Sequence, residues 1–146
     1  MPKSEHSEPV KASLSIIWDQ LVHKIYDPRN FVPGVTDVQI LEDDKEHHRV
    51  IRRMVISNPK GDNVIVEEIT WDEATHLVVF KLIEHPSHTG SVINRVDIKG
   101  ENDYVLTYRM EWTFKGEGED PLAAMSVKPA VIKTVQVIEA EAAVLS

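Results

Sequence analysis

The chain has 146 residues, of which 42% are hydrophobic and 27% charged, as is typical of one globular domain. With 24 acidic against 16 basic residues its formal net charge is −8, which disfavours binding to nucleic acid or anionic membranes. The absence of cysteine excludes disulfides, thiolate metal sites and a cysteine nucleophile. The polar N-terminus lacks a signal core and no apolar run could span a membrane, so we expect a single cytoplasmic domain over residues 1–146.

Helix signals come first along the chain. Ser13 is a suitable N-cap for a helix from about Leu14 to Tyr26, whose apolar residues recur on one helical face. The pair Asp27-Pro28 then predicts a short second helix through about Phe31, because aspartate caps a helix and proline fits its first position.

Strand patterns fill the middle of the chain. The joining segments are short, and the turn sequence at residues 58–63 is the clearest of them. Consecutive strands joined by short loops pair antiparallel, so we expect a meander. The predicted strands cover residues 35–42, 49–56, 64–71, 76–84, 91–99 and 103–114.

A long helix is predicted at the C-terminus, over residues 123–145. Pro129 should either kink this helix or mark its first turn. Because an antiparallel sheet needs a cover for one face and no other helix is long enough, the fold class is α+β with this helix on the sheet. One helical face carries Val131, Val135, Ile138, Ala142 and Leu145.

The last predicted strand alternates large apolar or aromatic side chains with polar ones. Such a face either fills a core or lines a ligand cavity, and its place just before the long helix favours the cavity wall. In that case the hydroxyls of Tyr104 and Tyr108 could bond a ligand carbonyl. The face carries Tyr104, Leu106, Tyr108, Met110, Trp112 and Phe114.

Several segments occur in an order that resembles one family. These are Ile17-Trp18-Asp19-Gln20-Leu21, Phe31-Val32-Pro33-Gly34, Glu68 followed by Phe80, Gly90-Ser91-Val92-Ile93-Asn94 and Leu106-Thr107-Tyr108-Arg109-Met110-Glu111-Trp112. Together they resemble the helix-grip fold of the START-like and polyketide cyclase (SRPBCC) superfamily and, more narrowly, its AtaL-like family.

The resemblance implies a curved antiparallel sheet around a long C-terminal helix, with an internal apolar cavity for lipids, polyketides, aromatics or steroids. It also implies a strand before the first helix, for which only residues 5–10 are available. It implies a pocket and a place in natural-product pathways, but no particular reaction. The residues expected to line the cavity are Trp18, Met54, Phe80, Tyr104, Tyr108, Met110 and Trp112.

Three polar residues are candidates for chemistry in that cavity. Glu67 and Glu68 lie on opposite, equally apolar faces of one strand, so one carboxylate must be buried, and we assign Glu68. Burial would raise its pKa and poise it for proton transfer, whereas an ion pair with a neighbouring arginine is the structural alternative. Arg52 and Asn94 also share faces with aliphatic residues. Arg52 could anchor a carboxylate or enolate oxygen or form an ion pair, and Asn94 could orient a substrate carbonyl or satisfy backbone groups at the strand end.

The seven histidines raise the question of a metal site. Glu84, His85 and His88 fall in one predicted loop and His47-His48 in a hairpin tip, and two histidines with a carboxylate make a reasonable ligand set. These spacings lack a regular framework that would align ligands, so we expect solvated loop histidines, no metal and no cofactor.

The leading hypothesis is a small hydrophobic-molecule-binding protein of specialised metabolism that acts as a cofactor-free cyclase, isomerase or dehydratase. Glu68 would be the acid or base, and Arg52 and Asn94 would stabilise the oxyanion. One alternative is a non-catalytic carrier of apolar ligands, and another is a cochaperone-like protein-interaction module. The expected partner is a hydrophobic or aromatic small molecule, and a homodimer is left open.

Overall fold

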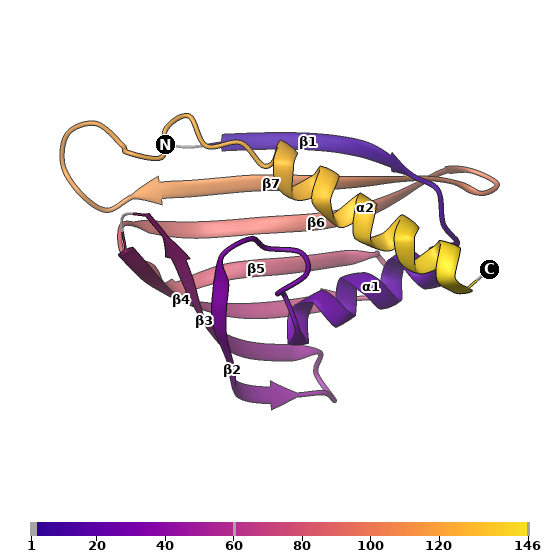
Figure 1. Cartoon of the computed structure of the whole chain (residues 1–146), viewed down its shortest axis with the longest axis horizontal. Coiled ribbons are helices and arrows are strands. Elements are labelled where there is room, and N and C mark those ends of the chain that lie inside the picture. The colour runs from indigo at the N-terminus through magenta and orange to yellow at the C-terminus, as the bar shows by residue number, and fades with distance from the viewer. Residues whose placement is uncertain (1–2, 60, 146) are drawn as a thin grey trace.

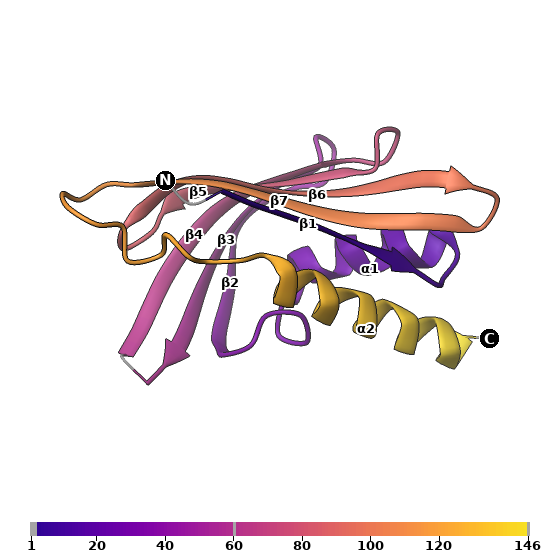
Figure 2. The ribbon, with the colours of Figure 1, turned by 90° about the horizontal axis from the view of Figure 1, so that it is seen from above.

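In the computed structural model, which describes residues 3–59 and 61–145, seven strands form one antiparallel sheet and two helices lie on its concave face (Figures 1 and 2). This is the predicted α+β helix-grip fold. The elements are β1 (Lys3–Val10), α1 (Leu14–Tyr26), β2 (Val35–Asp44), β3 (Arg49–Asn58), β4 (Gly61–Asp72), β5 (Leu77–Glu84), β6 (His88–Gly100), β7 (Asp103–Phe114) and α2 (Lys128–Leu145).

The strand order is β1-β7-β6-β5-β4-β3-β2, so β2 to β7 form the predicted meander. The first strand, implied by the family resemblance, adds to β7 with Lys3 opposite Glu111 and Val10 opposite Tyr104. Pro9 is tolerated within it because β1 is an edge strand, where a missing backbone donor costs no ladder bond. In the hairpin between β3 and β4, Lys60 lies outside the described residues.

Helix α1 begins as predicted, with the Ser13 hydroxyl accepting a hydrogen bond from the Ile16 amide at 3.2 Å. The prediction of a short helix after Asp27-Pro28 is wrong. The chain forms a turn there, in which the amides of Phe31 and Val32 both donate to the Pro28 carbonyl at 2.9 Å. Gly34 then has a φ of +85°, and a Cβ would lie 2.7 Å from the Ser57 carbonyl oxygen, so the turn is held tightly against β3.

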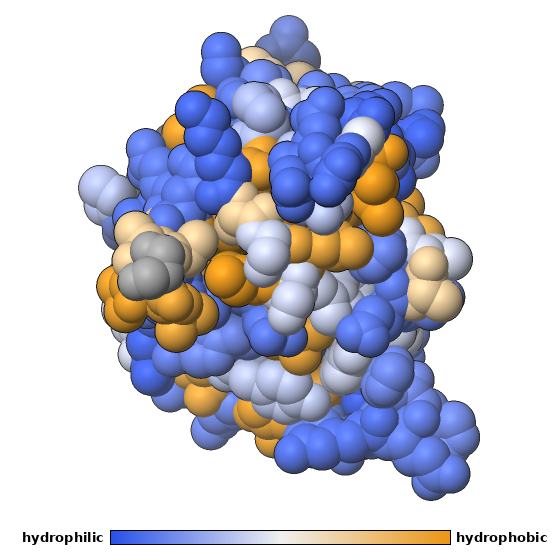
Figure 3. Space-filling model, turned by 90° about the vertical axis from the view of Figure 1, so that its right-hand side faces the viewer, coloured by the Kyte–Doolittle hydropathy of each residue, from blue (hydrophilic) through white to orange (hydrophobic). Residues whose placement is uncertain are grey.

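Helix α2 starts at Lys128, later than predicted, and Pro129 falls in its first turn, where its missing amide has no helical partner to lose. Its predicted apolar face is buried through Ile138, but Leu145 is 64% exposed. Figure 3 looks at the end of the molecule where α2 ends and shows apolar surface among polar surface. No helix in the described part of the chain is long and apolar enough to cross a membrane.

Helix α2 lies along β1 and β7 and also contacts α1, so the two helices and the inner sheet face enclose the core (Figure 2). The predicted inner face of β7 is correct, because Leu106, Tyr108, Met110 and Trp112 are all buried there. Ile17, Leu21 and Ile25 of α1 meet them from the other side. Polar side chains at one end of this core form the candidate site.

Candidate functional site at the concave face of the sheet

A pocket of about 210 Å³ lies between the inner sheet face, the C-terminal part of α1 and the segment that enters α2. Much of its wall is apolar, with Met54, Phe80, Val92 and Met110 from four strands. Val32 and Met125, from two connecting segments, also line it. Its polar side chains are Lys24, Arg52, Glu67, Asn94, Tyr108, Trp112 and Ser126.

Lys24 is the central polar residue of this pocket, and sequence reasoning missed it. It is only 7% exposed, and its Nζ donates hydrogen bonds to Asn94 Oδ1 at 2.9 Å and to Tyr108 Oη at 2.8 Å. The Nζ also lies 4.4 Å from the centroid of the Tyr108 ring and 4.8 Å from that of Phe80. A signal was present, because Lys24 follows Leu21 by three residues on the buried face of α1.

The surroundings of Lys24 favour its neutral form. Burial lowers the pKa of Lys24 from 10.5 to about 7; the charge of Arg52 acts in the same direction, and the Glu67 carboxylate opposes it. A neutral amine is therefore well populated near neutral pH. This is the protonation state in which a lysine can accept a proton or attack a carbon.

Tyr108 connects Lys24 to α2 through hydrogen bonds of defined direction. The Thr134 hydroxyl donates to the Ala130 carbonyl at 2.9 Å, so in the 2.6 Å contact between Tyr108 Oη and Thr134 Oγ1 the tyrosine is the donor. Burial raises the pKa of Tyr108, which keeps the phenol protonated. The phenol oxygen is then an acceptor for Lys24 and not a base.

Arg52 holds the C-terminal end of α1 on the sheet. Its Nη1 donates to the carbonyls of Lys24 and Ile25 at 3.0 and 2.8 Å, and its Nη2 donates to Glu67 Oε1 at 2.8 Å. A cation at helix C-terminal carbonyls is favourable, and Glu67 supplies the counter-charge that the buried guanidinium needs. This contact also fixes Lys24, because it fixes the helix that carries it.

Three buried donors of the pocket-lining residues have no acceptor in the described residues. They are Arg52 Nε, Asn94 Nδ2 and Trp112 Nε1, on side chains that are each at least nine-tenths buried. A buried donor without an acceptor costs about 1–3 kcal/mol, so native proteins rarely retain several together. These three side chains of the pocket residues therefore have hydrogen-bonding capacity that the described residues do not use.

The structure places some predicted site residues outside this pocket. The assignment of Glu68 to the cavity is wrong: its Oε2 accepts from Arg49 Nε at 2.9 Å on the other face, and its side chain is 30% exposed. Glu67, its neighbour, has the inward position. Trp18 packs edge-on against His76 and lines a separate recess, and Tyr104 packs, half-buried, at the edge of the core. The pocket does bring together Arg52, Met54, Phe80, Asn94, Tyr108, Met110 and Trp112.

His88 also differs from the prediction of a solvated loop histidine, because it is 1% exposed. Its Nε2 contacts Asp120 Oδ1 and its Nδ1 contacts Ser87 Oγ, both at 2.7 Å. These contacts, called here the His88 cluster, tie the start of β6 to the loop after β7. Among the described residues, no group of three His, Cys, Asp or Glu side chains is placed to hold a metal ion.

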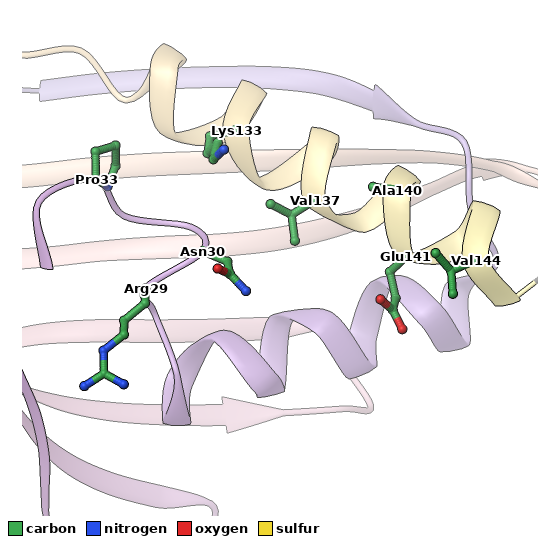
Figure 4. A pocket seen from close by; sticks show the side chains of 8 residues that line it. All are labelled: Arg29, Asn30, Pro33, Lys133, Val137, Ala140, Glu141 and Val144. Atoms are coloured by element: carbon green, nitrogen blue, oxygen red, sulfur yellow. The ribbon is translucent and has the colours of Figure 1, made fainter.

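A larger recess of about 540 Å³ lies between the turn after α1 and α2, lined in part by Arg29, Lys133 and Glu141 (Figure 4). Its charged side chains do not converge on one point in Figure 4. The buried donors without acceptors belong instead to side chains of the smaller pocket. We therefore take the smaller pocket as the candidate site.

Comparison with known proteins places the chain in a family. Residues 5–143 match the family described as acetylaranotin biosynthesis cluster protein L (AtaL). A comparison with curated proteins finds no match.

Solved structures of the same fold are similar to the chain. The Zhui aromatase/cyclase from Streptomyces sp. R1128 is 17% identical with a TM-score of 0.75, over 96% of this chain and 92% of that one. A START superfamily protein from Mycobacterium smegmatis is 11% identical with a TM-score of 0.71, over 99% of both chains. The di-domain aromatase/cyclase StfQ of the steffimycin pathway is 16% identical with a TM-score of 0.73, over 97% of this chain and 51% of that one. At these identities the likeness shows the fold alone.

Proposed function

Because the chain belongs to the AtaL family, we propose that it binds a hydrophobic or aromatic small molecule of natural-product biosynthesis and catalyses cofactor-free proton transfer next to a carbonyl group of that molecule. Cyclisation, isomerisation and dehydration all proceed through such a step. The observation that carries the proposal is the Lys24 amine, buried at the wall of a largely apolar pocket.

In this proposal Lys24 is the general base. A group works best as a base when its pKa lies near the working pH, and burial brings the pKa of Lys24 to about 7. Asn94 and Tyr108 hold the amine in one position through their hydrogen bonds. The neutral amine removes a proton from the carbon beside the carbonyl, and the ammonium later returns a proton to the product.

In this proposal the buried donors without acceptors stabilise the charge that proton removal creates. Proton removal leaves negative charge on the carbonyl oxygen, and preorganised N–H groups in a dry site stabilise such charge strongly. Arg52 Nε, Asn94 Nδ2 and Trp112 Nε1 are the donors free for this role. Glu67 replaces Glu68 as the pocket carboxylate, where it balances the charges of Arg52 and Lys24.

The size of the pocket limits what it can enclose. Drug-sized ligands occupy pockets of roughly 300–1,000 Å³, whereas this one has about 210 Å³. We therefore expect it to hold one or two rings or a short acyl segment around the reacting carbon. The rest of a larger substrate would extend past Val32 and Met125.

The test uses 2-tetralone, a bicyclic aromatic ketone, as a probe. The wild-type protein should accelerate exchange of its α-protons for deuterium in D₂O, followed by NMR. Lys24→Met should lower that rate by about 100-fold or more, the usual contribution of a positioned base. Lys81→Met, which removes an exposed lysine from β5, is the matched control and should have no effect.

Two outcomes would overturn the proposal. Binding of the ketone without exchange would leave a non-catalytic carrier, the alternative considered from the sequence. Unchanged exchange in a folded Lys24→Met variant would remove the amine from the chemistry.

A further inference from the structure

We propose that Lys24 also reacts as a nucleophile and forms a covalent imine with a free aldehyde or ketone group of the ligand. The inference rests on the proposed function, since both need a neutral amine in the pocket. It adds a covalent bond that proton transfer alone does not require. It also narrows the substrate class, because esters and acids do not form imines.

The hydrogen bonds of Lys24 leave its lone pair unassigned. A neutral amine has two N–H groups, and Asn94 Oδ1 and Tyr108 Oη accept one each, at 2.9 and 2.8 Å. The Tyr108 proton points to Thr134 instead of the amine, because the Thr134 hydroxyl itself donates to the Ala130 carbonyl. Among these partners nothing donates to the nitrogen, so its lone pair can attack a carbonyl carbon.

The surroundings of the amine also favour an imine. The rings of Phe80 and Tyr108 lie within 5 Å of Nζ, and Met54, Met110 and Val92 line the same pocket. Apolar walls limit access of water, which would hydrolyse the product. The lowered pKa of Lys24 supports the geometry, because an ammonium cannot attack.

Lys24 differs from the other lysines of the described residues, all of which are exposed. A free lysine side chain in water has a pKa near 10.4, so at pH 7 only about one such amine in 2,500 is neutral. Lys24, with a pKa of about 7, is neutral in roughly half of the molecules at that pH. This contrast makes faster labelling of Lys24 than of the exposed lysines the expected result.

The chemistry balances without any further reactant except a proton. The nitrogen lone pair bonds to the carbonyl carbon, and one amine proton ends on the former carbonyl oxygen to give a carbinolamine. That oxygen takes up one proton, supplied by the buffer acid, and leaves as water with the electrons of the C–O bond, while the remaining nitrogen lone pair forms the C=N bond. The products are an iminium and one water molecule.

The iminium would deepen the proposed function. Its positive nitrogen acidifies the neighbouring C–H bond, and the resulting enamine is a carbon nucleophile suited to ring closure. Lys24 then no longer serves as the base, and Glu67 is the carboxylate of the pocket that can take the proton. Hydrolysis of the iminium by one water molecule restores the amine and the carbonyl.

The test traps the imine with sodium cyanoborohydride, which reduces it to a stable secondary amine. The full-length protein is incubated at pH 7 with 2-tetralone or benzaldehyde, and adducts are located by peptide mass spectrometry. We expect Lys24 to be labelled more than about tenfold faster than any exposed lysine, given the difference in pKa. Lys24→Met should lose this adduct and Lys81→Met should keep it.

Mapping of the wild-type protein needs no variant to fold, so the outcome is decisive in either direction. Labelling of Lys24 at or below the rate of exposed lysines overturns the imine. If 2-tetralone still exchanges its α-protons in that case, the proposed function stands and only the covalent step falls. If exchange is absent as well, both fall.

Discussion

The Lys24 site and the His88 cluster are both buried and polar, yet they differ in how their hydrogen bonds are satisfied. Both imidazole nitrogens of His88 have side-chain partners at 2.7 Å, and the cluster joins two segments of chain. At the Lys24 site three donors have no acceptor within the described residues, and their side chains line a pocket. The His88 cluster retains one buried acceptor without a partner, Asp120 Oδ2, but only the Lys24 site combines unpaired donors with a pocket, which makes it the candidate for ligand binding.

A large expected effect on stability tests this contrast directly. His88→Leu removes the ring that bonds Ser87 and Asp120, so we expect a loss of roughly 1–3 kcal/mol in the free energy of unfolding. The His88 ring also packs against Trp112, with centroids 5.7 Å apart, so the exchange rate of 2-tetralone per folded molecule should change, but far less than in Lys24→Met. Urea denaturation and NMR exchange give the two quantities. Loss of exchange in folded His88→Leu would mean that the His88 cluster belongs to the functional site.

Burial of Lys24 should also make the stability of the protein depend on pH. The pKa of Lys24 is lowered from 10.5 to about 7 in the folded state, so between these values the unfolded chain binds the proton and the folded chain does not. The unfolding free energy should therefore rise with pH from about 7, by up to about 1.4 kcal/mol per pH unit. Lys24→Met should remove this slope when both proteins are compared between pH 7 and 9.5. An identical slope in the two proteins would contradict the lowered pKa.

The fold was predictable from the sequence because its signals are local. Ser13, the alternating β7 residues and the short loops fixed α1 and the meander from spacing alone. The prediction of a short helix after Asp27-Pro28 failed because contacts with a distant strand determine the conformation of that segment. Gly34 brings that turn against the Ser57 carbonyl of β3, and nothing near it in the sequence encodes this approach.

The site was only partly predictable, because its chemistry depends on residues that are distant in the chain. Strand periodicity identified Arg52, Asn94 and Tyr108 as inward-facing, but it could not decide whether Glu67 or Glu68 faces inward. The structure decides for Glu67, because Arg52 bonds both the α1 carbonyls and the Glu67 carboxylate. Lys24 was missed because a lysine on a helix is usually solvated. Its spacing from Leu21 was a weak signal, and its hydrogen bonds to partners from β6 and β7 show that it is held inside.

A smaller effect is expected from Tyr108→Phe, which removes one of the two acceptors of Lys24. Loss of one hydrogen bond to a positioned group should lower α-proton exchange by about tenfold. Removing an acceptor disfavours the ammonium form, so the midpoint of the pH–rate profile should move to lower pH. Tyr104→Phe is the matched control, because Tyr104 is not among the residues that line the pocket. A midpoint that stays in place would show that the phenol does not bond the amine in solution.

The smallest effect is expected from Glu68→Gln, although sequence reasoning chose Glu68 as the acid or base. Its carboxylate bonds Arg49 on the outer face of β4, where solvent screens the pair, so neither the exchange rate nor its pH profile should change. Glu67→Gln removes the counter-charge of buried Arg52 and should destabilise the protein. Glu67 also raises the pKa of Lys24, so in any folded Glu67→Gln protein the pH–rate midpoint should fall. If Glu68→Gln instead abolished exchange, the inward face of β4 would have to be reassigned, and the Lys24 site with it.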